Sequence, residues 1–193
     1  DAKIKRFAPR LIATLGRAID FCQATLAYGR AAEATPVLKD VTLRQLVADQ
    51  AEMLGLSEAA RVSFSNDVPG ELIAPCDPDQ MARVLLNLMR NSVQALTQAE
   101  AEDGRRPTLA VKAERDNGSV ILRVVDNGPG VPERARANLF QAFRGSVTPG
   151  GTGLGLAVAA ELVRLHGGAI ALEPSETGAV FKVTLPGRRQ AAA

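Results

Sequence analysis

The chain has 193 residues, enough for one domain of about 150 residues and a smaller appendage. Its apolar fraction of 46% with 23% charged residues is typical of a folded, soluble protein and excludes an intrinsically disordered one. The net charge of +2 arises from interleaved acids and bases, so neither nucleic acid nor a membrane surface is an expected partner.

The ends and the cysteines limit the cellular context. No apolar run reaches the ~20 residues of a membrane span, and the start at Asp1 is neither a signal peptide nor an initiator Met. We therefore expect a fragment of a longer protein, cytoplasmic either on its own or as the cytoplasmic part of a membrane receptor. Cys22 and Cys76 form no Cys-x-x-Cys pair, so two reduced thiols are expected and a metal site is not.

The first forty residues are predicted to form a unit of their own. Apolar residues recur every three or four positions over residues 9–29, which predicts a long helix whose apolar face needs a partner. Residues 31–39 lose this periodicity and contain Pro36, which indicates a linker and a domain boundary near residue 40. The main domain is expected over residues 41–187, followed by a disordered tail over residues 188–193.

Helices and strands alternate through the main domain. Thr42 is predicted to cap a helix that ends at Gly55, with Gln45 as its capping-box partner, and Asp77 before Pro78 is predicted to cap a second, amphipathic helix. A short helix is expected over residues 133–140, and another over residues 157–166. Strands are expected over residues 62–66, 71–74, 108–114, 120–125, 169–172 and 180–185.

This order of elements predicts the fold class. We expect an α/β (α+β) two-layer sandwich in which helices cover one face of a mixed β-sheet, preceded by the long N-terminal helix. The other face of the sheet is expected to stay polar.

The glycine-rich stretch Gly150-Gly151-Thr152-Gly153-Leu154-Gly155-Leu156 opens directly into a helical pattern. Its glycines allow positive φ and close approach of a ligand, and free N–H groups at a helix N-terminus suit a phosphate. The stretch lacks the Lys of a P-loop, and it does not have the spacing of the dinucleotide fingerprint. A tight strand-to-helix turn is therefore the alternative interpretation.

Two asparagines, Asn87 and Asn91, lie four apart on the helix that Asp77 caps, so their amides project side by side. Because they adjoin the apolar stripe, they would suit Mg²⁺, which takes oxygen ligands and keeps several waters, together with phosphate oxygens. A solvated helix face with two ordinary asparagines is the alternative.

The tripeptide Asp-Asn-Gly occurs twice. Asp116-Asn117-Gly118 separates two alternating strands and is explained as a hairpin turn. Asp126-Asn127-Gly128 follows an apolar strand and continues into Pro129-Gly130. A carboxylate at the end of a central strand can accept a hydrogen bond from the exocyclic amine of adenine, whereas the carbonyl of guanine would be repelled.

Further candidates flank these motifs. Phe140 and Phe143 are interpreted as core anchors or ligand contacts, and Arg90 and Arg144 as ordinary surface residues or phosphate contacts. His166, the only histidine, precedes two glycines at a helix end, where it is expected to meet the last carbonyls and not to be catalytic.

Four motifs in this order resemble the N, G1, F and G2 boxes of bacterial sensor histidine kinases. They are Asp79-x-x-x-x-Arg83-Val84-Leu85-Leu86-Asn87-Leu88-Met89-Arg90-Asn91, Asp126-x-Gly128-x-Gly130, Leu139-Phe140-x-x-Phe143 and Gly151-Thr152-Gly153-Leu154-Gly155-Leu156. The ATP-binding domain of that family shares its fold with gyrase, the mismatch-repair ATPases and the ninety-kilodalton heat-shock chaperone. The likeness spans residues 42–186.

The resemblance implies a role for each matched residue. Asn91 would be a Mg²⁺ ligand, and Asn87 would support the metal and the phosphates of ATP. Asp126 would read the adenine amine in a pocket shaped by Gly128 and Gly130. The glycine motif (Gly151, Thr152, Gly153, Leu154 and Gly155) would form the hinge and phosphate floor of an ATP lid.

One position departs from the family. Many members have a Lys where this chain has Gln94, so phosphate charge would be met elsewhere, with Arg90 and Arg144 as candidates. Asn87 stands where the gyrase-type ATPases have a catalytic Glu, which favours the kinase branch.

The resemblance also implies partners. Residues 9–29 are similar to the second helix of the family's dimerisation and phosphoacceptor hairpin, through Arg17-Ala18-Ile19-Asp20 and Leu26-Ala27-Tyr28-Gly29-Arg30. No His-Glu or His-Asp pair occurs, so the acceptor histidine would belong to the full-length kinase, a homodimer that works with a response regulator, and self-phosphorylation of this chain is not expected. The alternatives are a non-catalytic phosphorelay adaptor and an anti-sigma-type serine kinase.

Overall fold

A computed structural model describes residue 22 and residues 35–57, 60–98, 106–142 and 153–187. The predicted N-terminal helix and the predicted tail lie outside the described residues, except for Cys22, which is helical.

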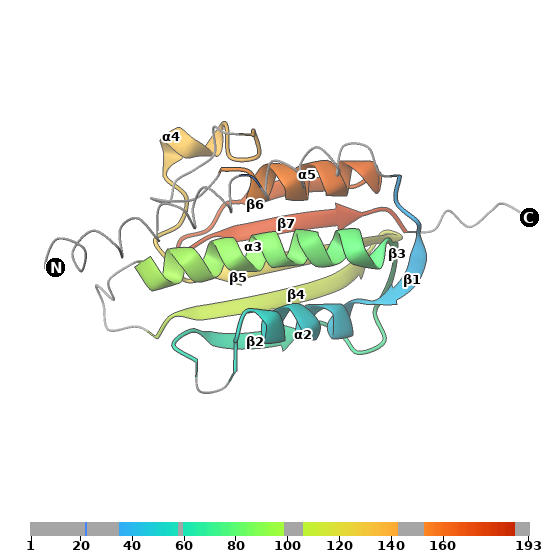
Figure 1. Ribbon diagram of the computed structural model, residues 1–193, viewed down its shortest axis with the longest axis horizontal. Helices are drawn as coiled ribbons and strands as arrows, with labels where there is room; N and C mark the ends of the chain where they lie inside the picture. Colours follow the sequence, from blue (N-terminus) through green and yellow to red (C-terminus); the bar gives the residue numbers. More distant parts are fainter. Residues whose placement is uncertain (1–21, 23–34, 58–59, 99–105, 143–152, 188–193) are drawn as a thin grey trace, which may run out of the picture.

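The main domain has two layers (Figure 1), and α2 (Leu43–Met53), α3 (Pro78–Gln98) and α5 (Gly155–Leu165) lie across one face of a sheet. The sheet has five strands, in the order β2 (Ser63–Asp67), β4 (Thr108–Asp116), β5 (Ser119–Asp126), β7 (Val180–Leu185) and β6 (Ala169–Glu173). β2 pairs parallel with β4 and the other pairs are antiparallel. The predicted two-layer sandwich with a mixed sheet is therefore confirmed.

Three smaller elements complete the described part of the chain. β1 (Lys39–Thr42) and β3 (Ile73–Cys76) form a separate antiparallel pair, and α4 (Glu133–Arg136) is a single turn. The sequence did not predict β1, which is only four residues long and largely exposed.

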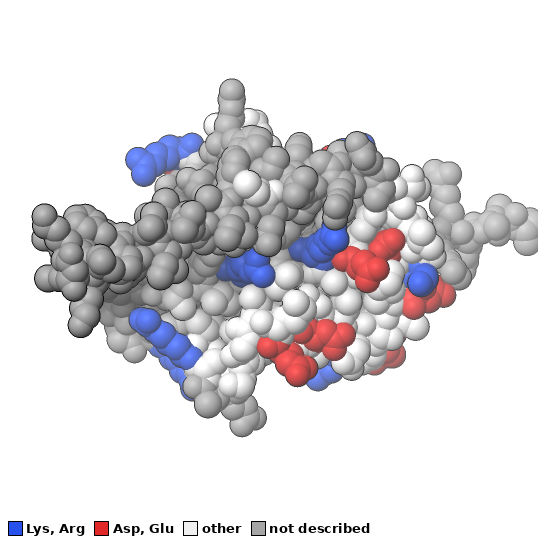
Figure 2. Space-filling view, viewed as in Figure 1, with Lys and Arg blue, Asp and Glu red and all other residues white. Residues whose placement is uncertain are grey.

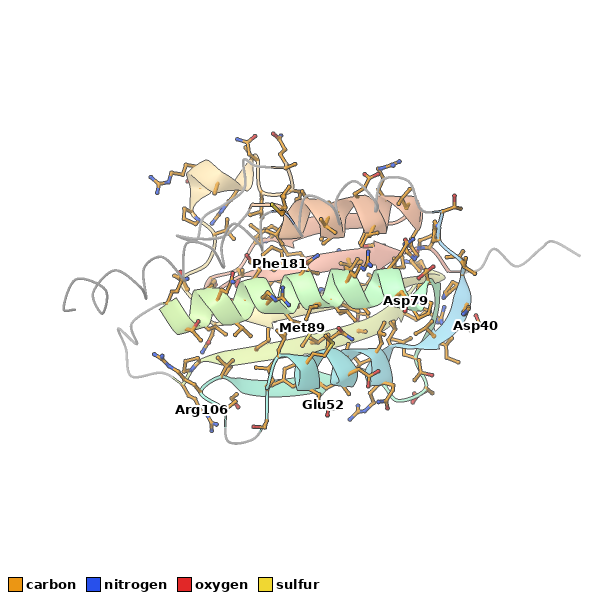
Figure 3. All side chains as sticks on the ribbon, viewed as in Figure 1. Asp40, Glu52, Asp79, Met89, Arg106 and Phe181 are labelled. Carbon is orange, nitrogen blue, oxygen red and sulfur yellow. The ribbon has the colours of Figure 1, made fainter. Side chains whose placement is uncertain are left out.

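The core lies between the helices and the sheet. Leucine, valine and methionine side chains of α3 point to it at helical spacing, and alternate residues of β5 and β7 meet them. Among the residues labelled in Figure 3, Met89 of α3 and Phe181 of β7 come from the two layers, and both are fully buried. Burial of each such side chain contributes about 1.5–3 kcal/mol, so this packing holds α3 against the sheet.

The opposite face of the sheet carries the predicted polar side chains, together with the buried Ile121 of β5. Arg123 on β5 pairs with Glu114 at 2.6 Å and with Glu173 at 2.9 Å, and Lys182 reaches Glu173 at 3.0 Å. The hydrogen bonds from Arg123 and Lys182 hold the pKa of Glu173 below its ordinary value. Since these side chains are partly exposed, each pair adds little stability, and their effect is to keep this face hydrated.

The predicted cap at the start of α3 is confirmed. Asp77 Oδ1 accepts hydrogen bonds from the N–H groups of Asp79 and Gln80 at 3.1 Å, and Oδ2 accepts one from Val37 at 2.9 Å. Desolvation raises the pKa of Asp77, but these backbone donors outweigh it and the pKa lies below 3.8.

His166 takes the structural role that the sequence predicts for it. Its Nε2 accepts the Asp77 N–H at 3.0 Å, and its Nδ1 lies 2.7 Å from the Leu162 carbonyl oxygen. These partners are both satisfied by a neutral ring that carries its proton on Nδ1. The histidine therefore joins the end of α5 to the start of α3.

Two local predictions are wrong. Thr42 occupies the N-cap position of α2 but its side chain makes no capping bond, and Gln45 instead donates to Asp49 at 2.8 Å. The reason is that Thr42 ends β1, where it pairs with Ile73, so tertiary pairing fixes the start of the helix. The predicted helix over residues 133–140 is helical only as α4 and continues as turns.

Candidate functional site

The candidate site centres on Asp126, the last residue of β5, which is 4% exposed. Its Oδ1 accepts hydrogen bonds from the N–H groups of Gly128 at 3.0 Å and Ala179 at 3.1 Å. Its Oδ2 accepts one from the hydroxyl of Ser92 on α3 at 2.6 Å. Three segments far apart in the sequence therefore hold one buried carboxylate in place.

The glycines around Asp126 are required by space and conformation. Gly130 has φ +74°, and a Cβ there would lie 2.9 Å from the carbonyl oxygen of Gly178. Gly178, in the β6–β7 turn, has φ +70°, and a Cβ there would overlap the Asp126 carbonyl. The sequence predicted Gly130 as a site residue but not Gly178.

Asn127 ties the loop after Asp126 to the start of β4. Its Oδ1 accepts the Thr108 N–H at 2.7 Å, and its Nδ2 donates to the Arg106 carbonyl oxygen at 3.0 Å. A backbone bond from Asn127 N–H to the Thr108 carbonyl oxygen, at 3.3 Å, adds to this clamp. The loop is therefore anchored on both sides of the carboxylate.

The two predicted asparagines lie on α3 beside α5. A Cβ on Gly155 would lie 3.4 Å from Asn87 Oδ1, so the Asn87 amide contacts the first residue of α5. Asn87 and Asn91 are both partly buried. Within the described ranges, no hydrogen bond involves either side-chain amide, which leaves both amides available to a ligand.

α5 begins where a phosphate site was predicted. Gly153 has φ +67°, which glycine adopts without strain, and the buried Leu154 precedes the first helical residue, Gly155. The N-cap residue Leu154 makes no side-chain capping bond to the described residues, and a helix N-terminus presents N–H groups and a partial positive charge. The structure thus brings Asn87 and this helix start together.

Only some of the remaining site candidates lie within the described residues. Arg83 and Arg90 are exposed on α3, and Figure 2 shows basic side chains over the middle of this helix. Gln94 is exposed on the same helix. Phe140 is half-buried and packs on the core. Phe143, Arg144, Gly151 and Thr152 lie outside the described residues, so their roles stay predictions.

The family model described as "Histidine kinase-, DNA gyrase B-, and HSP90-like ATPase" matches residues 76–189, which is more than half of the 193 residues. The chain belongs to this family. The match runs from the residue before Asp77 to beyond β7, so it includes every described residue of the candidate site.

The relatives are sensor histidine kinases. The chain is 31% identical over 185 residues to the sensor histidine kinase TmoS of Ectopseudomonas mendocina, covering 94% of this chain and 19% of that protein. It spans less than a third of the length of the curated relatives it matches. The predicted resemblance to sensor histidine kinases is therefore confirmed for a part of such proteins.

Solved structures show the same fold. Full-length ShkA, crystallised in complex with AMPPNP, gives a TM-score of 0.75 at 24% identity, covering 100% of this chain and 40% of that one. Histidine kinase ThkA in complex with the response regulator protein TrrA gives 0.74 at 23% identity, covering 98% and 53%. At these identities the likeness concerns the fold alone.

Ser92 is a site residue that the sequence did not predict. It is fully buried on α3, at a position that continues the apolar spacing of Leu85, Leu88 and Leu96. A polar residue on the buried stripe of an amphipathic helix needs a hydrogen-bond partner. That exception to the periodicity was the available signal, but it could not show that the partner is Asp126.

Other kinds of site find no support in the described part of the chain. There, no group of three or more His, Cys, Asp or Glu side chains could hold a metal ion, and no helix is long and apolar enough to cross a membrane. Both cysteines are free thiols. Burial, and the nearby charge of Asp77, raise the pKa of Cys76 to about 12, so this thiol stays protonated at neutral pH.

Proposed function

We propose that this chain is the ATP-binding catalytic region of a two-component sensor histidine kinase, and that it transfers the γ-phosphate of Mg²⁺–ATP to a histidine outside the chain. The observation that carries the proposal is the buried Asp126 carboxylate, held at the end of a central strand with one acceptor position that no described residue occupies. Membership of the ATPase family and the sensor kinase relatives support it.

Adenine is the base that the Asp126 site suits. A carboxylate offers about four acceptor positions, and three of those on Asp126 are occupied. The exocyclic amine of adenine would donate to the fourth, whereas a guanine carbonyl would face a negative charge. Gly128 and Gly130 would leave room for the flat ring against the backbone, with Phe140 and Phe143 at its border.

The phosphates would lie between α3 and the start of α5. Asn91 would coordinate Mg²⁺ through its amide oxygen, and Asn87 would support the metal and the phosphates. The available amides of both residues fit a cation that prefers oxygen ligands. When bound, Mg²⁺ would neutralise charge on the phosphate oxygens.

The remaining phosphate contacts would come from the glycine motif and from arginine. Gly151, Thr152, Gly153, Leu154 and Gly155 would form the lid hinge and phosphate floor. Arg90 and Arg144 would provide the cationic contacts that the family's Lys makes, since Gln94 is uncharged.

The chain's own contribution to the reaction is position and charge. A ring nitrogen of the acceptor histidine would attack the γ-phosphorus while the bond to the ADP oxygen breaks, a reaction that needs little covalent help. The chain would hold the base and α- and β-phosphates still and leave the γ-phosphate exposed. The AMPPNP bound to ShkA is consistent with this kind of ligand on the same fold.

The proposal extends to the rest of the protein. Residues 1–40 would be the second helix and linker of a dimerisation and phosphoacceptor hairpin, and residues 41–187 the ATP-binding domain. The full-length kinase would be a cytoplasmic or membrane-linked homodimer that donates its phosphate to a response regulator, as suggested by the ThkA complex with TrrA.

Two measurements test the proposal. Calorimetry with Mg²⁺–ATP should show binding, which Asn91→Ala weakens and the exposed neighbour Gln94→Ala, its matched control, does not. With γ-labelled ATP, label should appear on a histidine-containing hairpin added in trans but not on this chain.

Other outcomes would contradict the proposal. Absence of heat with Mg²⁺–ATP would favour a non-catalytic adaptor on the same fold. Label on a serine, stable to acid where phosphohistidine is not, would favour a serine kinase. Label on the chain itself would show that its acceptor lies within it.

A further inference from the structure

We propose that Ser92 is a positioning residue for nucleotide selection: its hydroxyl holds Asp126 Oδ2 so that one acceptor position of that oxygen is left for the exocyclic amine of adenine. The proposal deepens the function proposed above and rests on the ATP pocket being at Asp126. It assigns a role in base recognition to a residue on the helix that also bears Asn87 and Asn91.

The distribution of donors on the carboxylate supports this role. Oδ1 accepts two backbone N–H groups, from Gly128 and Ala179, and its two lone pairs are therefore used. From the described residues, Oδ2 accepts a single hydrogen bond, that of the Ser92 hydroxyl at 2.6 Å, a length typical of a hydroxyl bound to an ionised carboxylate. The remaining acceptor position lies on Oδ2, so the residue that shares this oxygen decides its direction.

Ser92 differs from an ordinary helix serine. Serine and threonine inside helices commonly donate to a carbonyl of their own helix. Thr97 does this on the same helix, since its hydroxyl lies 2.8 Å from the Val93 oxygen and 3.1 Å from the Gln94 oxygen. Ser92 instead crosses to a residue 34 positions away.

Burying this hydroxyl costs free energy unless it has a hydrogen-bond partner. Ser92 has no exposed surface, and its neighbours on the buried stripe of α3 are Leu88 and Leu96. An apolar residue would suit such a position better, because a buried hydroxyl loses its water. Within the described residues, Ser92 is also the one side-chain donor to Asp126, the other two being backbone groups.

The mechanism predicts a specific loss. Without the hydroxyl, both lone pairs of Oδ2 become available, and a water molecule or a rotated carboxylate can occupy the position that the amine needs. Binding of ATP should therefore weaken, whereas a nucleotide that has no amine at this ring position should be affected much less.

The experiment compares ATP with purine riboside triphosphate, which lacks only the exocyclic amine, by calorimetry with Mg²⁺. We expect Ser92→Ala to weaken ATP about tenfold and the deaminated analogue less than about threefold. Ser92→Thr, which keeps the hydroxyl, should restore preference for ATP. Thr97→Ala is the matched control, because it removes a hydroxyl from the same helix and should leave both affinities unchanged.

Each result has a defined meaning. Equal weakening of both nucleotides by Ser92→Ala, or no weakening at all, would overturn the role of Ser92 while leaving the ATP pocket in place. Failure of the unmodified chain to bind either nucleotide would instead overturn the proposed function. A thermal melt shows whether Ser92→Ala is folded. If it is not, Ser92→Cys, whose thiol is close in size to the hydroxyl but is a weak hydrogen-bond donor, should give the same selective loss.

Discussion

The two Asp-Asn-Gly tripeptides have the same sequence and different structures. Asp116-Asn117-Gly118 is the β4–β5 turn, with φ of 48° at Asn117 and 82° at Gly118, and its Asp is exposed. Asp126-Asn127-Gly128 begins at the end of β5. Its Asp is buried and accepts hydrogen bonds from α3 and the β6–β7 turn.

The contrast separates a local motif from a site. At the first tripeptide, the geometry of a turn of four consecutive residues is enough to explain the conformation of all three. At the second, the Asp126 carboxylate also accepts hydrogen bonds from α3 and the β6–β7 turn, and one of its acceptor positions is unused by the described residues. The same three residues are therefore a turn or a candidate binding site depending on what surrounds them, and the following substitutions test that difference in pairs.

The largest effect is expected for the glycine pair Gly178→Ala and Gly118→Ala. Both glycines have positive φ, but a Cβ at Gly178 would overlap the Asp126 carbonyl, whereas a Cβ at Gly118 has nothing within 4 Å. We expect Gly178→Ala to lower the free energy of unfolding by about 4 kcal/mol and Gly118→Ala by about 1 kcal/mol. Urea unfolding measures both losses. Equal losses would show that the positive φ, and not the overlap with the Asp126 carbonyl, determines the cost.

The next effect is expected for Asp126→Asn against Asp116→Asn. An amide at position 126 turns one acceptor oxygen into a donor that faces either N–H groups or the Ser92 hydroxyl. We expect ATP affinity to fall by about a hundredfold, near 3 kcal/mol, with loss of preference over GTP. Asp116→Asn should leave it unchanged. Calorimetry decides, and unchanged affinity in Asp126→Asn would refute the pocket assignment.

A smaller effect is expected for the asparagine pair. Asn127→Ala leaves the Thr108 N–H and the Arg106 carbonyl without their side-chain partner, so the free energy of unfolding should fall by about 2 kcal/mol. Asn117→Gly removes a side chain from a position with φ 48° and should change stability by less than about 0.5 kcal/mol. Thermal and urea unfolding compare them, and the reverse order would contradict the clamp.

The smallest effect concerns Asp77, a third aspartate with three hydrogen bonds, all from backbone groups. Desolvation opposes the lowering of its pKa below 3.8, but the backbone donors prevail, so the cap stabilises the ionised form. That stability is fully present above pH 3.8 and is lost as the pH falls through the lower folded pKa.

Asp77→Ala should therefore cost about 1 kcal/mol at pH 7, and the difference from the unmodified chain should shrink below pH 3.8. Urea unfolding across this range measures it. ATP affinity at pH 7 should not change, which distinguishes a capping carboxylate from the one at Asp126. A difference that grows on acidification would contradict the direction of the pKa shift.

The sequence by itself determined the features that depend on neighbours along the chain. The Asp77-Pro78 cap, the Asn117-Gly118 turn, the amphipathic pattern of α3 and the strand alternation each act over a few residues, so periodicity and turn chemistry predict them. The order of the four glycine, asparagine and phenylalanine motifs also indicated the family. Thr42 shows the limit, since pairing with Ile73 overrides its capping preference.

Only the tertiary structure decided which distant groups meet. Two of the three partners of the Asp126 carboxylate are 34 and 53 residues away, and His166 reaches Asp77 across 89 residues. No local pattern encodes such pairs, because packing of α3 and α5 on the sheet brings them together. Burying a polar group is costly unless it has a hydrogen-bond partner. The contact between Ser92 and Asp126 therefore explains why both can be buried, and only the tertiary structure shows that contact.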